Sequence, residues 1–566
     1  YNFSLQAFIT SPKKYKLYLF LSAMPHQSPF GPLTPSTTTI HDDMLTKIEK
    51  IARKEPNKKA LIEGANRSRF LTFAQVCDQT YAVAQFLHNH GLSRKTAVTV
   101  LPNCIEYAPF CIGVFMEGAT LSGASALFTE YELTRQLKDC QANVIFTDDA
   151  HLDRVVKAMT EVPSIQLTIV KTSKSILPPG MVSWNEVIAT RVDHSRPKVP
   201  INVEEDVALL PYSSGTTGAP KGVMLTHRNF GTLLKMIIRV RELNDANGPF
   251  PFWDTAKEHR LIFLPLYHVM GFVAACLCLM AGSTGVVLSH FEPHLFLSCL
   301  QDFKVQQLSV VPPILLFLAK SPLCDHYNLT SLRRVSCGAA PAGKDICDEL
   351  MRRYPNIDFV QQGYGMSELT SGACLADNQS RTKFGSCGKA APGLELKIVD
   401  PETGVEREEG QAGELCVRGP TVMKGYLGRD EATRECVRDG WMHTGDLAYI
   451  DSDGDVFIVD RLKELIKVKG LQVAPAELED LLLSHPHVAD AAVVGVPDAA
   501  SGELPKAFII KKHDSLTAEE LFNYVKDRVA HYKQLKGGIE FIEHIPKSPS
   551  GKILRKILRE KLTSKI

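Results

Sequence analysis

A ten-residue segment rich in glycine and hydroxyl side chains is the part of this sequence best suited to chemistry. It reads Ser213-Ser214-Gly215-Thr216-Thr217-Gly218-Ala219-Pro220-Lys221-Gly222 and follows an apolar run, Val207 to Pro211. Glycines let backbone N–H groups approach an anion, hydroxyls donate further hydrogen bonds, and Lys221 adds a positive charge. The segment therefore predicts a polyphosphate site, with a plain surface turn as the alternative. It is not the G-x-x-x-x-G-K-[ST] loop, because Gly218 stands three residues before Lys221 and Gly222 follows.

Four later segments carry polar side chains that could act together with this loop. Taken alone, each has an ordinary explanation: Asp446 suits a turn or a helix cap, and Lys552 lies in a basic tail that suits a solvated face. The four segments are Tyr-Gly-Met-Ser-Glu at 364–368, His-Thr-Gly-Asp at 443–446, Asp-Arg-Leu-Lys-Glu-Leu-Ile-Lys-Val-Lys-Gly at 460–470 and Pro-Lys-Ser-Pro-Ser-Gly-Lys at 546–552.

With the glycine-rich loop, these segments stand in the order found in the adenylate-forming superfamily, which contains 4-coumarate:CoA ligases, fatty acyl-CoA synthetases and insect luciferases. The chain resembles this superfamily from about residue 40 to its end, and most closely the 4-coumarate:CoA ligase-like enzymes. The resemblance implies ATP, Mg²⁺ and coenzyme A as cofactors and a small-molecule carboxylic acid as substrate.

The resemblance also implies roles for individual residues at the nucleotide. Tyr364 would stack on adenine, Ser367 would contact the α-phosphate region, and Glu368 would bind Mg²⁺. Asp446 and Arg461 would hydrogen-bond the ribose hydroxyls, which suits a carboxylate acceptor and a guanidinium donor. The loop residues Ser213 to Gly218 and Lys221 would hold the phosphates.

The acyl group would lie beside Tyr267 and His268, between walls formed by Gly338 and Gly365. A lone histidine in the apolar region Leu261 to Leu288 is otherwise a satisfied core histidine. Both glycines are equally compatible with simple turns.

Lys552 is the expected catalytic residue of adenylate formation. A carboxylate attacking the α-phosphate brings two anions together, and a lysine between them offsets the repulsion and the charge of the transition state.

A second half-reaction with a bulky thiol requires the site to rearrange. By resemblance, a small C-terminal domain would swing about a hinge at Lys463. Lys469 and Gly470 would then face coenzyme A, and Lys467 and Gln472 would assist catalysis; an ordinary β-hairpin surface is the alternative for all four residues.

The elements needed to position these residues are legible along the chain. Short apolar runs (Val98 to Leu101, Val144 to Thr147, Leu308 to Val311) alternate with helical patterns such as Phe73 to His88, which is an α/β arrangement. Hairpin-like pieces follow residue 400, and a helix begins at Pro475 in a compact C-terminal unit. In that unit Thr517 and Glu520 predict a capping box.

We therefore expect an α/β fold: a large N-terminal domain of α/β sheet subdomains plus a β-rich subdomain, and a small, mobile α+β domain. The expected bounds are 24–460 and 461–566. Residues 1–23 read as an extension outside the fold, although their lysines and apolar stretch faintly resemble a secretory signal.

Composition excludes some partners. Lys plus Arg number 64 and Asp plus Glu 63, which gives a net charge of +1. This balance does not favour binding to nucleic acid.

The apolar region Leu261 to Leu288 is long enough for a membrane span. Pro265, His268 and the glycines of this region favour a buried helix and strand instead, so we expect no transmembrane segment. The 14 scattered cysteines suggest neither a disulfide framework nor a metal site. The final Ser564-Lys565-Ile566 resembles a peroxisomal address, with the cytoplasm as the alternative location.

The expected function is an ATP-dependent acid:CoA ligase that forms an acyl-adenylate and then an acyl-CoA. The alternatives are a luciferase-like enzyme or peptide-synthetase adenylation module with another second half-reaction, and a silent nucleotide-binding paralogue. Leu369-Thr370-Ser371-Gly372 replaces the Ala-Gly-Pro-Val usual in plant 4-coumarate ligases, so an aryl acid and a fatty acid both stay open.

Overall fold

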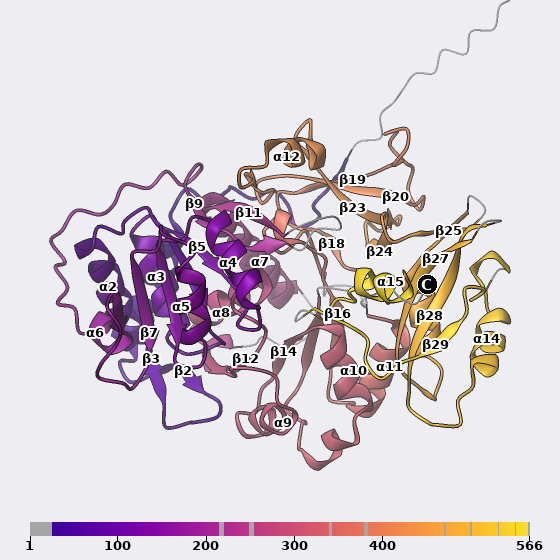
Figure 1. Cartoon of the computed structure of the whole chain (residues 1–566), viewed down its shortest axis with the longest axis horizontal. Helices are drawn as coiled ribbons and strands as arrows, with labels where there is room; N and C mark the ends of the chain where they lie inside the picture. Colours follow the sequence, from indigo (N-terminus) through magenta and orange to yellow (C-terminus); the bar gives the residue numbers. More distant parts are fainter. Residues whose placement is uncertain are drawn as a thin grey trace, which may run out of the picture.

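The computed structural model describes residues 25–213, 220–247, 254–338, 342–377, 383–468, 471–498, 501–529, 531–548 and 551–563. It is a mixed α/β fold in which a large assembly of sheets and helices carries a smaller C-terminal domain at one side, next to helices α10 and α11 (Figure 1). The expected extension, residues 1–23, lies outside the described residues. The expected fold class is confirmed.

The largest sheet has a mainly parallel centre, in the order β10-β11-β9-β5-β4-β6-β7-β8, with β21 paired to β11. The predicted strands at Val98–Leu101 and Val144–Thr147 are confirmed within two residues as β4 and β6. Buried on both faces, such strands require continuous apolar sequence. The strands are β4 (Thr96–Val100), β5 (Thr120–Gly123), β6 (Val144–Asp148), β7 (Leu167–Lys171), β8 (Met181–Ser183), β9 (Val207–Leu209), β10 (Tyr212–Ser213), β11 (Lys221–Thr226) and β21 (Gly425–Tyr426).

Helices cover this sheet, and the predicted helix Phe73–His88 is confirmed as α2. Thr72 and Gln75 form a complete capping box at its start, which satisfies two backbone donors that would otherwise lack partners. The helices are α1 (Ile40–Lys54), α2 (Phe73–Asn89), α3 (Tyr107–Met116), α4 (Glu130–Asp139), α5 (Leu152–Met159), α6 (Trp184–Ile188) and α7 (His227–Asn247).

Two smaller sheets continue the large domain, in the orders β12-β13-β2-β3 and β14-β15-β16. The region Leu261–Leu288 contains the end of β12, the buried helix α8 and strand β13, as expected. No helix among the described residues is long and apolar enough to cross a bilayer. The elements are β2 (Lys59–Glu63), β3 (Phe70–Thr72), β12 (His259–Ile262), α8 (Val269–Met280), β13 (Thr284–Val287), α9 (Pro293–Asp302), β14 (Gln307–Val310), α10 (Pro312–Lys320), β15 (Arg334–Cys337), α11 (Lys344–Arg353) and β16 (Phe359–Gln362).

The predicted β-rich part is a six-stranded sheet, β1-β19-β20-β23-β22 with β24 on β23. In its acidic turn, Lys383 Nζ lies 2.6 Å from Asp451 Oδ2 and contacts Asp453, so a lysine balances the carboxylates. The strands of this sheet are β1 (His26–Gln27), β19 (Glu395–Val399), β20 (Gly413–Arg418), β22 (Val437–Arg438), β23 (Trp441–Ile450) and β24 (Val456–Arg461). Helix α12 (Asp430–Cys436) precedes β22, and β17 (Cys374–Leu375) and β18 (Lys389–Ala390) form a separate two-stranded sheet.

The C-terminal domain is a five-stranded sheet flanked by helices. Helix α13 begins at Pro475 as expected. Thr517 caps α14 by accepting the Glu520 N–H, but the capping box is only half as expected, because the Glu520 carboxylate lies 3.4 Å from His485 Nε2. The elements are β25 (Ile466–Val468), β26 (Leu471–Val473), α13 (Pro475–Leu483), β27 (Val488–Asp498), β28 (Gly502–Lys511), α14 (Ala518–Lys526), β29 (Ile539–Phe541) and α15 (Arg555–Thr563).

Candidate active site

Strands β10 and β11 form a hairpin at the two ends of the glycine-rich loop, with Ser213 directly opposite Lys221. The loop residues Ser214, Gly215, Thr216, Thr217 and Gly218 lie outside the described residues. The Ser213 hydroxyl is buried and has no hydrogen-bond partner among the described residues. A buried hydroxyl without a partner is costly, so it suits a ligand that supplies one.

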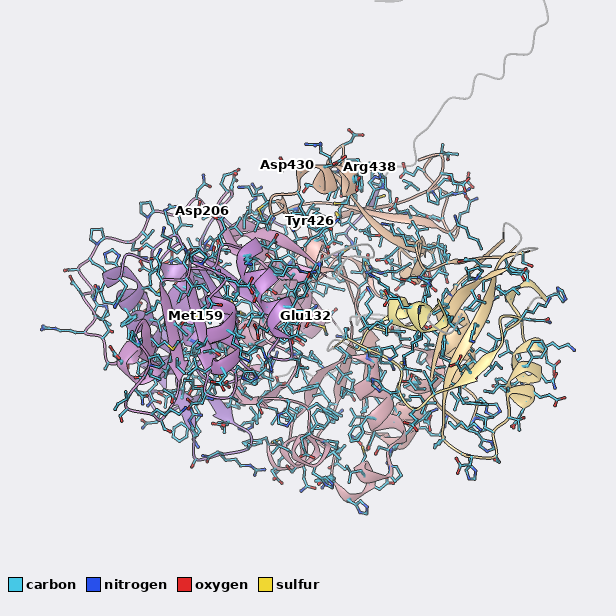
Figure 2. The ribbon with its side chains drawn as sticks, viewed as in Figure 1. Glu132, Met159, Asp206, Tyr426, Asp430 and Arg438 are labelled. Atoms are coloured by element: carbon cyan, nitrogen blue, oxygen red, sulfur yellow. The ribbon has the colours of Figure 1, made fainter. Side chains whose placement is uncertain are left out.

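Tyr426, which the sequence did not predict as a site residue, contacts two of the predicted site residues. Its ring lies 5.0 Å from Lys221 Nζ, and its hydroxyl donates to Glu368 Oε1 at 2.9 Å. Tyr426, labelled in Figure 2, lies on β21 and pairs with Val223 of β11. Burial raises the pKa of the Tyr426 phenol, and the Glu368 charge raises it further, so the hydroxyl remains a donor. Glu368, only 5% exposed, therefore has a fixed orientation.

Tyr364, Asp446 and Arg461 form one group, although 97 positions separate the first from the last. Asp446 on β23 pairs with Arg461 on β24, with 3.1 Å between Oδ1 and Nε. The Tyr364 hydroxyl donates to Asp446 Oδ2 at 2.6 Å. Asp446 is 3% exposed, and each carboxylate oxygen has a second lone pair that can accept from a ligand hydroxyl.

Lys552 lies close enough to this group for its charges to matter. The pKa of Lys552 is lowered to about 8, chiefly by burial and then by the Arg461 charge, against an opposing effect of the Asp446 charge. The turn that presents the lysine is tied back, because the Lys552 N–H donates to Ser548 Oγ at 3.1 Å. The structure thus brings together residues from four separate predicted segments.

Gly551, directly before Lys552, packs the small domain against the large one. Its φ is +79°, and a Cβ there would lie 2.7 Å from Pro313 Cδ at the start of α10. A side chain would be strained and would also collide with the large domain. Glycine therefore allows the lysine turn to approach the site this closely.

His268 caps the N-terminus of α8, where its Nδ1 accepts the Met270 N–H at 3.3 Å. Burial lowers its pKa, so the ring is neutral and carries its proton on Nε2. Tyr267 and His268 border a cavity whose other walls include Tyr107, Leu121, Leu266 and Phe272. A polar N–H at the edge of an apolar cavity suits the carboxyl end of an apolar acid.

The two glycines expected in the acyl pocket differ in what surrounds them. A Cβ on Gly338 would meet only the flexible Met270 side chain closely, at 3.2 Å, which suits a pocket wall. A Cβ on Gly365 would lie 1.4 Å from the Ser371 carbonyl oxygen. Close backbone packing alone explains glycine at 365.

The residues expected to act after a domain movement are on the small domain or its connection. Lys463 is exposed in the turn between β24 and β25. Lys467 is exposed on β25, where its N–H donates to Glu503 at 2.8 Å and it pairs with Gln472. Lys469, Gly470 and the Gln472 side chain lie outside the described residues. Strand β24 includes Arg461, so the large domain's sheet extends one residue beyond the expected boundary.

Comparison with known proteins defines the class. The profile of the AMP-binding enzyme family matches residues 48–427, and that of the AMP-binding enzyme C-terminal domain matches residues 477–552. The chain belongs to the AMP-binding enzyme family.

Particular relatives extend this result. The chain is 40% identical over 516 residues to 4-coumarate–CoA ligase 2 of Nicotiana tabacum, covering 90% of this chain and 92% of the relative. ATP-bound MatB of Rhodopseudomonas palustris superposes with a TM-score of 0.79 at 25% identity, covering 91% and 98% of the two chains. The o-succinylbenzoate CoA synthetase of Bacillus subtilis, solved with its acyl-adenylate, gives 0.74 at 28% identity, covering 91% and 97%.

Proposed function

We propose that this chain is an ATP-dependent acid:CoA ligase. In the first half-reaction, a carboxylate oxygen attacks the α-phosphorus of ATP and pyrophosphate leaves, which forms an acyl-adenylate. In the second, the thiol of coenzyme A attacks the acyl carbon and AMP leaves. The observation that carries the proposal is the convergence of Lys552 with Tyr364, Asp446 and Arg461.

Each residue of this group has a task in the first half-reaction. Asp446 and Arg461 hold the ribose hydroxyls, and the Tyr364 ring lies against the adenine. Lys552 places its ammonium between the acid and the α-phosphate, where it offsets the charge that develops. His268 donates from Nε2 to the acid's carboxyl group and aligns it for attack.

Glu368 is the residue we assign to Mg²⁺. Tyr426 engages Oε1 of its carboxylate, and Oε2 is the oxygen offered to the cation, which prefers a carboxylate together with substrate phosphates. When bound, Mg²⁺ neutralises charge on the phosphates. Lys221 and Ser213 bind the same phosphates from the hairpin, together with the loop residues 214–218.

The second half-reaction uses the other face of the small domain. A rotation of the small domain about Lys463 moves Lys552 away from the nucleotide. The same rotation brings Lys467, Lys469, Gly470 and Gln472 towards the adenylate. Lys469 and Gly470 then face coenzyme A, where glycine at 470 leaves room for the pantetheine arm, and Lys467 and Gln472 assist catalysis. The pantetheine thiol then reaches an acyl group that has not been displaced.

The substrate is an apolar acid, aryl or fatty, because the walls around His268 are apolar. Because relatives are named 4-coumarate–CoA ligases, 4-coumarate is the first acid to include in a substrate panel. We also propose that Ser564-Lys565-Ile566 acts as a peroxisomal address; fluorescent fusions with and without the tripeptide test this.

A panel of carboxylic acids assayed for acid-dependent ATP/pyrophosphate exchange and for acyl-CoA formation tests the function. Both activities with at least one aryl or fatty acid are expected. Exchange without thioester would favour a relative with another second half-reaction, such as a luciferase-like enzyme, which would instead consume oxygen. Nucleotide binding without exchange for any acid would favour the silent paralogue.

A further inference from the structure

The β-rich sheet contains an irregularity at Asp446. In the pairing of β20 with β23, Cys416 stands opposite His443 and Glu414 opposite Leu447. Residues 444–446 therefore face Leu415 alone, and β23 bulges outward. Gly445, at the middle of the bulge, has a φ of +70°. A bulge breaks the ladder and leaves backbone groups that need other partners.

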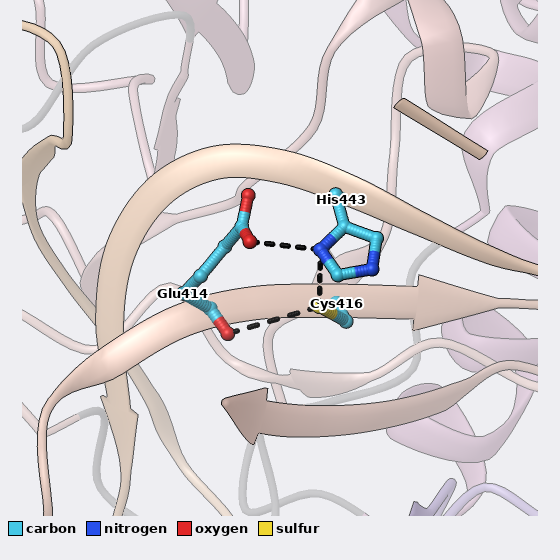
Figure 3. Close-up of side chains that lie close together, drawn as sticks. All are labelled: Glu414, Cys416 and His443. Atoms are coloured by element: carbon cyan, nitrogen blue, oxygen red, sulfur yellow. Dashed lines mark hydrogen bonds and ion pairs between the residues drawn. The ribbon is translucent and has the colours of Figure 1, made fainter. Parts of the chain in front are cut away.

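The Glu414 carboxylate supplies such a partner, because Oε1 accepts the Gly445 N–H at 3.0 Å. Oε2 lies 2.8 Å from His443 Nδ1 (Figure 3). Within the bulge, the Thr444 hydroxyl donates to the Leu415 carbonyl at 2.8 Å and accepts the Asp446 N–H at 3.1 Å. Glu414 thus holds the bulge on both sides of Thr444.

The same three side chains, Glu414, Cys416 and His443, lie close enough together to suggest a metal site. Their hydrogen bonding opposes this. His443 Nδ1 donates its hydrogen to Glu414, so this nitrogen has no lone pair for a metal. Burial raises the pKa of the Cys416 thiol to about 12, so the thiol carries its proton at neutral pH and a metal would have to displace it.

The charge state of Glu414 matches a clamp. Burial alone would raise its pKa, but the hydrogen bond and charge of His443 and the Gly445 N–H together bring the pKa below its usual value. An ionised carboxylate makes stronger hydrogen bonds than a neutral acceptor. Charge-assisted bonds from Glu414 on β20 therefore fix the bulge in β23 and, with it, the position of Asp446.

We propose that Glu414 is a positioning residue for the nucleotide: it fixes the bulge so that Asp446 meets Arg461 and Tyr364 in the orientation that accepts the ribose hydroxyls. The inference rests on the proposed function. Glu414 touches neither substrate nor cofactor and acts through Asp446.

Glu414→Gln tests the inference with little change in volume. The amide oxygen can still accept the Gly445 N–H, but the amide N–H₂ then faces His443 Nδ1. We expect the KM for ATP to rise about tenfold, the cost of one charge-assisted bond, with the KM for the acid and kcat at saturating ATP within about twofold. Glu414→Ala should raise the KM for ATP further.

Glu395→Gln is the matched control, because Glu395 lies in the same sheet and binds Gln27 and Arg418. The KM for ATP of this control variant should be unchanged.

A double-mutant cycle makes the test decisive. If Glu414 acts through Asp446, Glu414→Gln should add little to the loss of AMP affinity in Asp446→Asn. Full additivity of the two substitutions would overturn the proposal. So would a Glu414→Gln variant in which the KM for ATP, the KM for the acid and kcat are all impaired equally. A Glu414→Gln variant with native thermal stability and unchanged AMP affinity would also overturn it. AMP affinity is measured by titration without any acid, so failure of the proposed ligase reaction would appear separately, as a wild-type chain that binds AMP and forms no adenylate.

Discussion

The proposed first half-reaction depends on Lys552, and the residues around this lysine explain its position and its lowered pKa. The lysine comes from the last part of the chain, yet the charges of Arg461 and Asp446 act on its ammonium. Arg555, three residues later, forms a buried ion pair with Glu479 of α13 at 2.7 Å. The segment is therefore anchored on both sides of its functional residue.

Replacing Lys552 by alanine should separate the two half-reactions. We expect acid-dependent ATP/pyrophosphate exchange to fall about 10²- to 10³-fold, as when a transition-state charge partner is lost. Thioester formation from supplied acyl-adenylate and coenzyme A should stay within a fewfold of the wild-type rate. Lys547→Ala is the control, since Lys547 belongs to the same segment but pairs with Asp490 at 2.6 Å. Undiminished exchange in Lys552→Ala would refute the assigned role.

Tyr426→Phe should weaken the binding of Mg²⁺. The variant keeps the ring beside Lys221 but removes the hydroxyl that orients Glu368. Because partners of ligating carboxylates tune metal affinity, the Mg²⁺ concentration for half-maximal exchange should rise about tenfold. Tyr449→Phe, whose ring stacks on Phe457, should behave as wild type. An unchanged Mg²⁺ titration in Tyr426→Phe would leave the hydroxyl without a function.

The sequence singles out the motif residues as candidates, but not the residues that support them. Asp446 and Glu368 are found from local sequence because each belongs to a contiguous motif. Tyr426 lies 58 positions from Glu368, and Glu414 lies 31 positions from Gly445. Each is an ordinary strand residue in sequence, and its role depends on which strands become neighbours. Contacts between remote segments leave no periodic pattern, so no local signal distinguishes them.

At the scale of elements, the sequence was most informative where one residue type serves one local purpose. Pro475 begins α13 because its fixed φ suits the first helical turn. The capping box at Thr517 formed only in part, because Glu520 also faces His485 and the tertiary partner prevailed over the local one. The reason for Gly365 was likewise visible only in the folded chain, where the Ser371 backbone lies against it.

A buried pair of histidines joins helices α1 and α7 and should make the fold sensitive to acid. His41 and His227 are 5% and 1% exposed, and burial lowers the pKa of each from 6.5 to about 4. The unfolded chain therefore binds protons that the folded chain does not. The stability these groups contribute is complete above pH 6.5 and is lost as the pH falls towards 4.

Chemical denaturation between pH 7.5 and 4 measures this effect. The free energy of unfolding should fall in that window by an amount bounded at about 3 kcal/mol for each histidine. His41→Gln should lower stability at pH 7.5 and flatten its dependence on pH. His544→Gln replaces an exposed histidine and should change neither. A wild-type curve that is flat from pH 6.5 to 4 would contradict the buried neutral state.

At the scale of the whole molecule, the two domains meet at the start of α11 as well as at Gly551. The backbone of Gly343 is extended, with φ −61° and ψ 149°, a conformation open to any residue. A Cβ there would nevertheless lie 1.6 Å from Asp480 Oδ1 of α13. Close by, Lys320 Nζ donates to the Leu483 carbonyl at 3.3 Å. These contacts belong to the orientation in which Lys552 lies near Arg461 and Asp446.

Gly343→Ala is therefore a selective probe of this orientation. The large domain itself should not be strained, but docking of the small domain would require Asp480 to move. We expect exchange to slow severalfold while thioester formation from supplied acyl-adenylate is retained. Asp480→Ala, which removes the opposing atom, should restore exchange in the double variant. Equal loss of both half-reactions, or no restoration, would show that the contact does not govern the docked orientation.

The pairing of Asp446 with Arg461 has one more consequence. Arg461 ends its strand, the Leu462 N–H donates to the Gly445 carbonyl at 2.9 Å, and the proposed pivot Lys463 follows at once. The sugar of a bound nucleotide would thus sit almost on the axis of rotation. Points near a rotation axis move least. The acyl-adenylate would therefore stay where it formed while the residues of the small domain around it change. The reactive intermediate would not have to move to a second site.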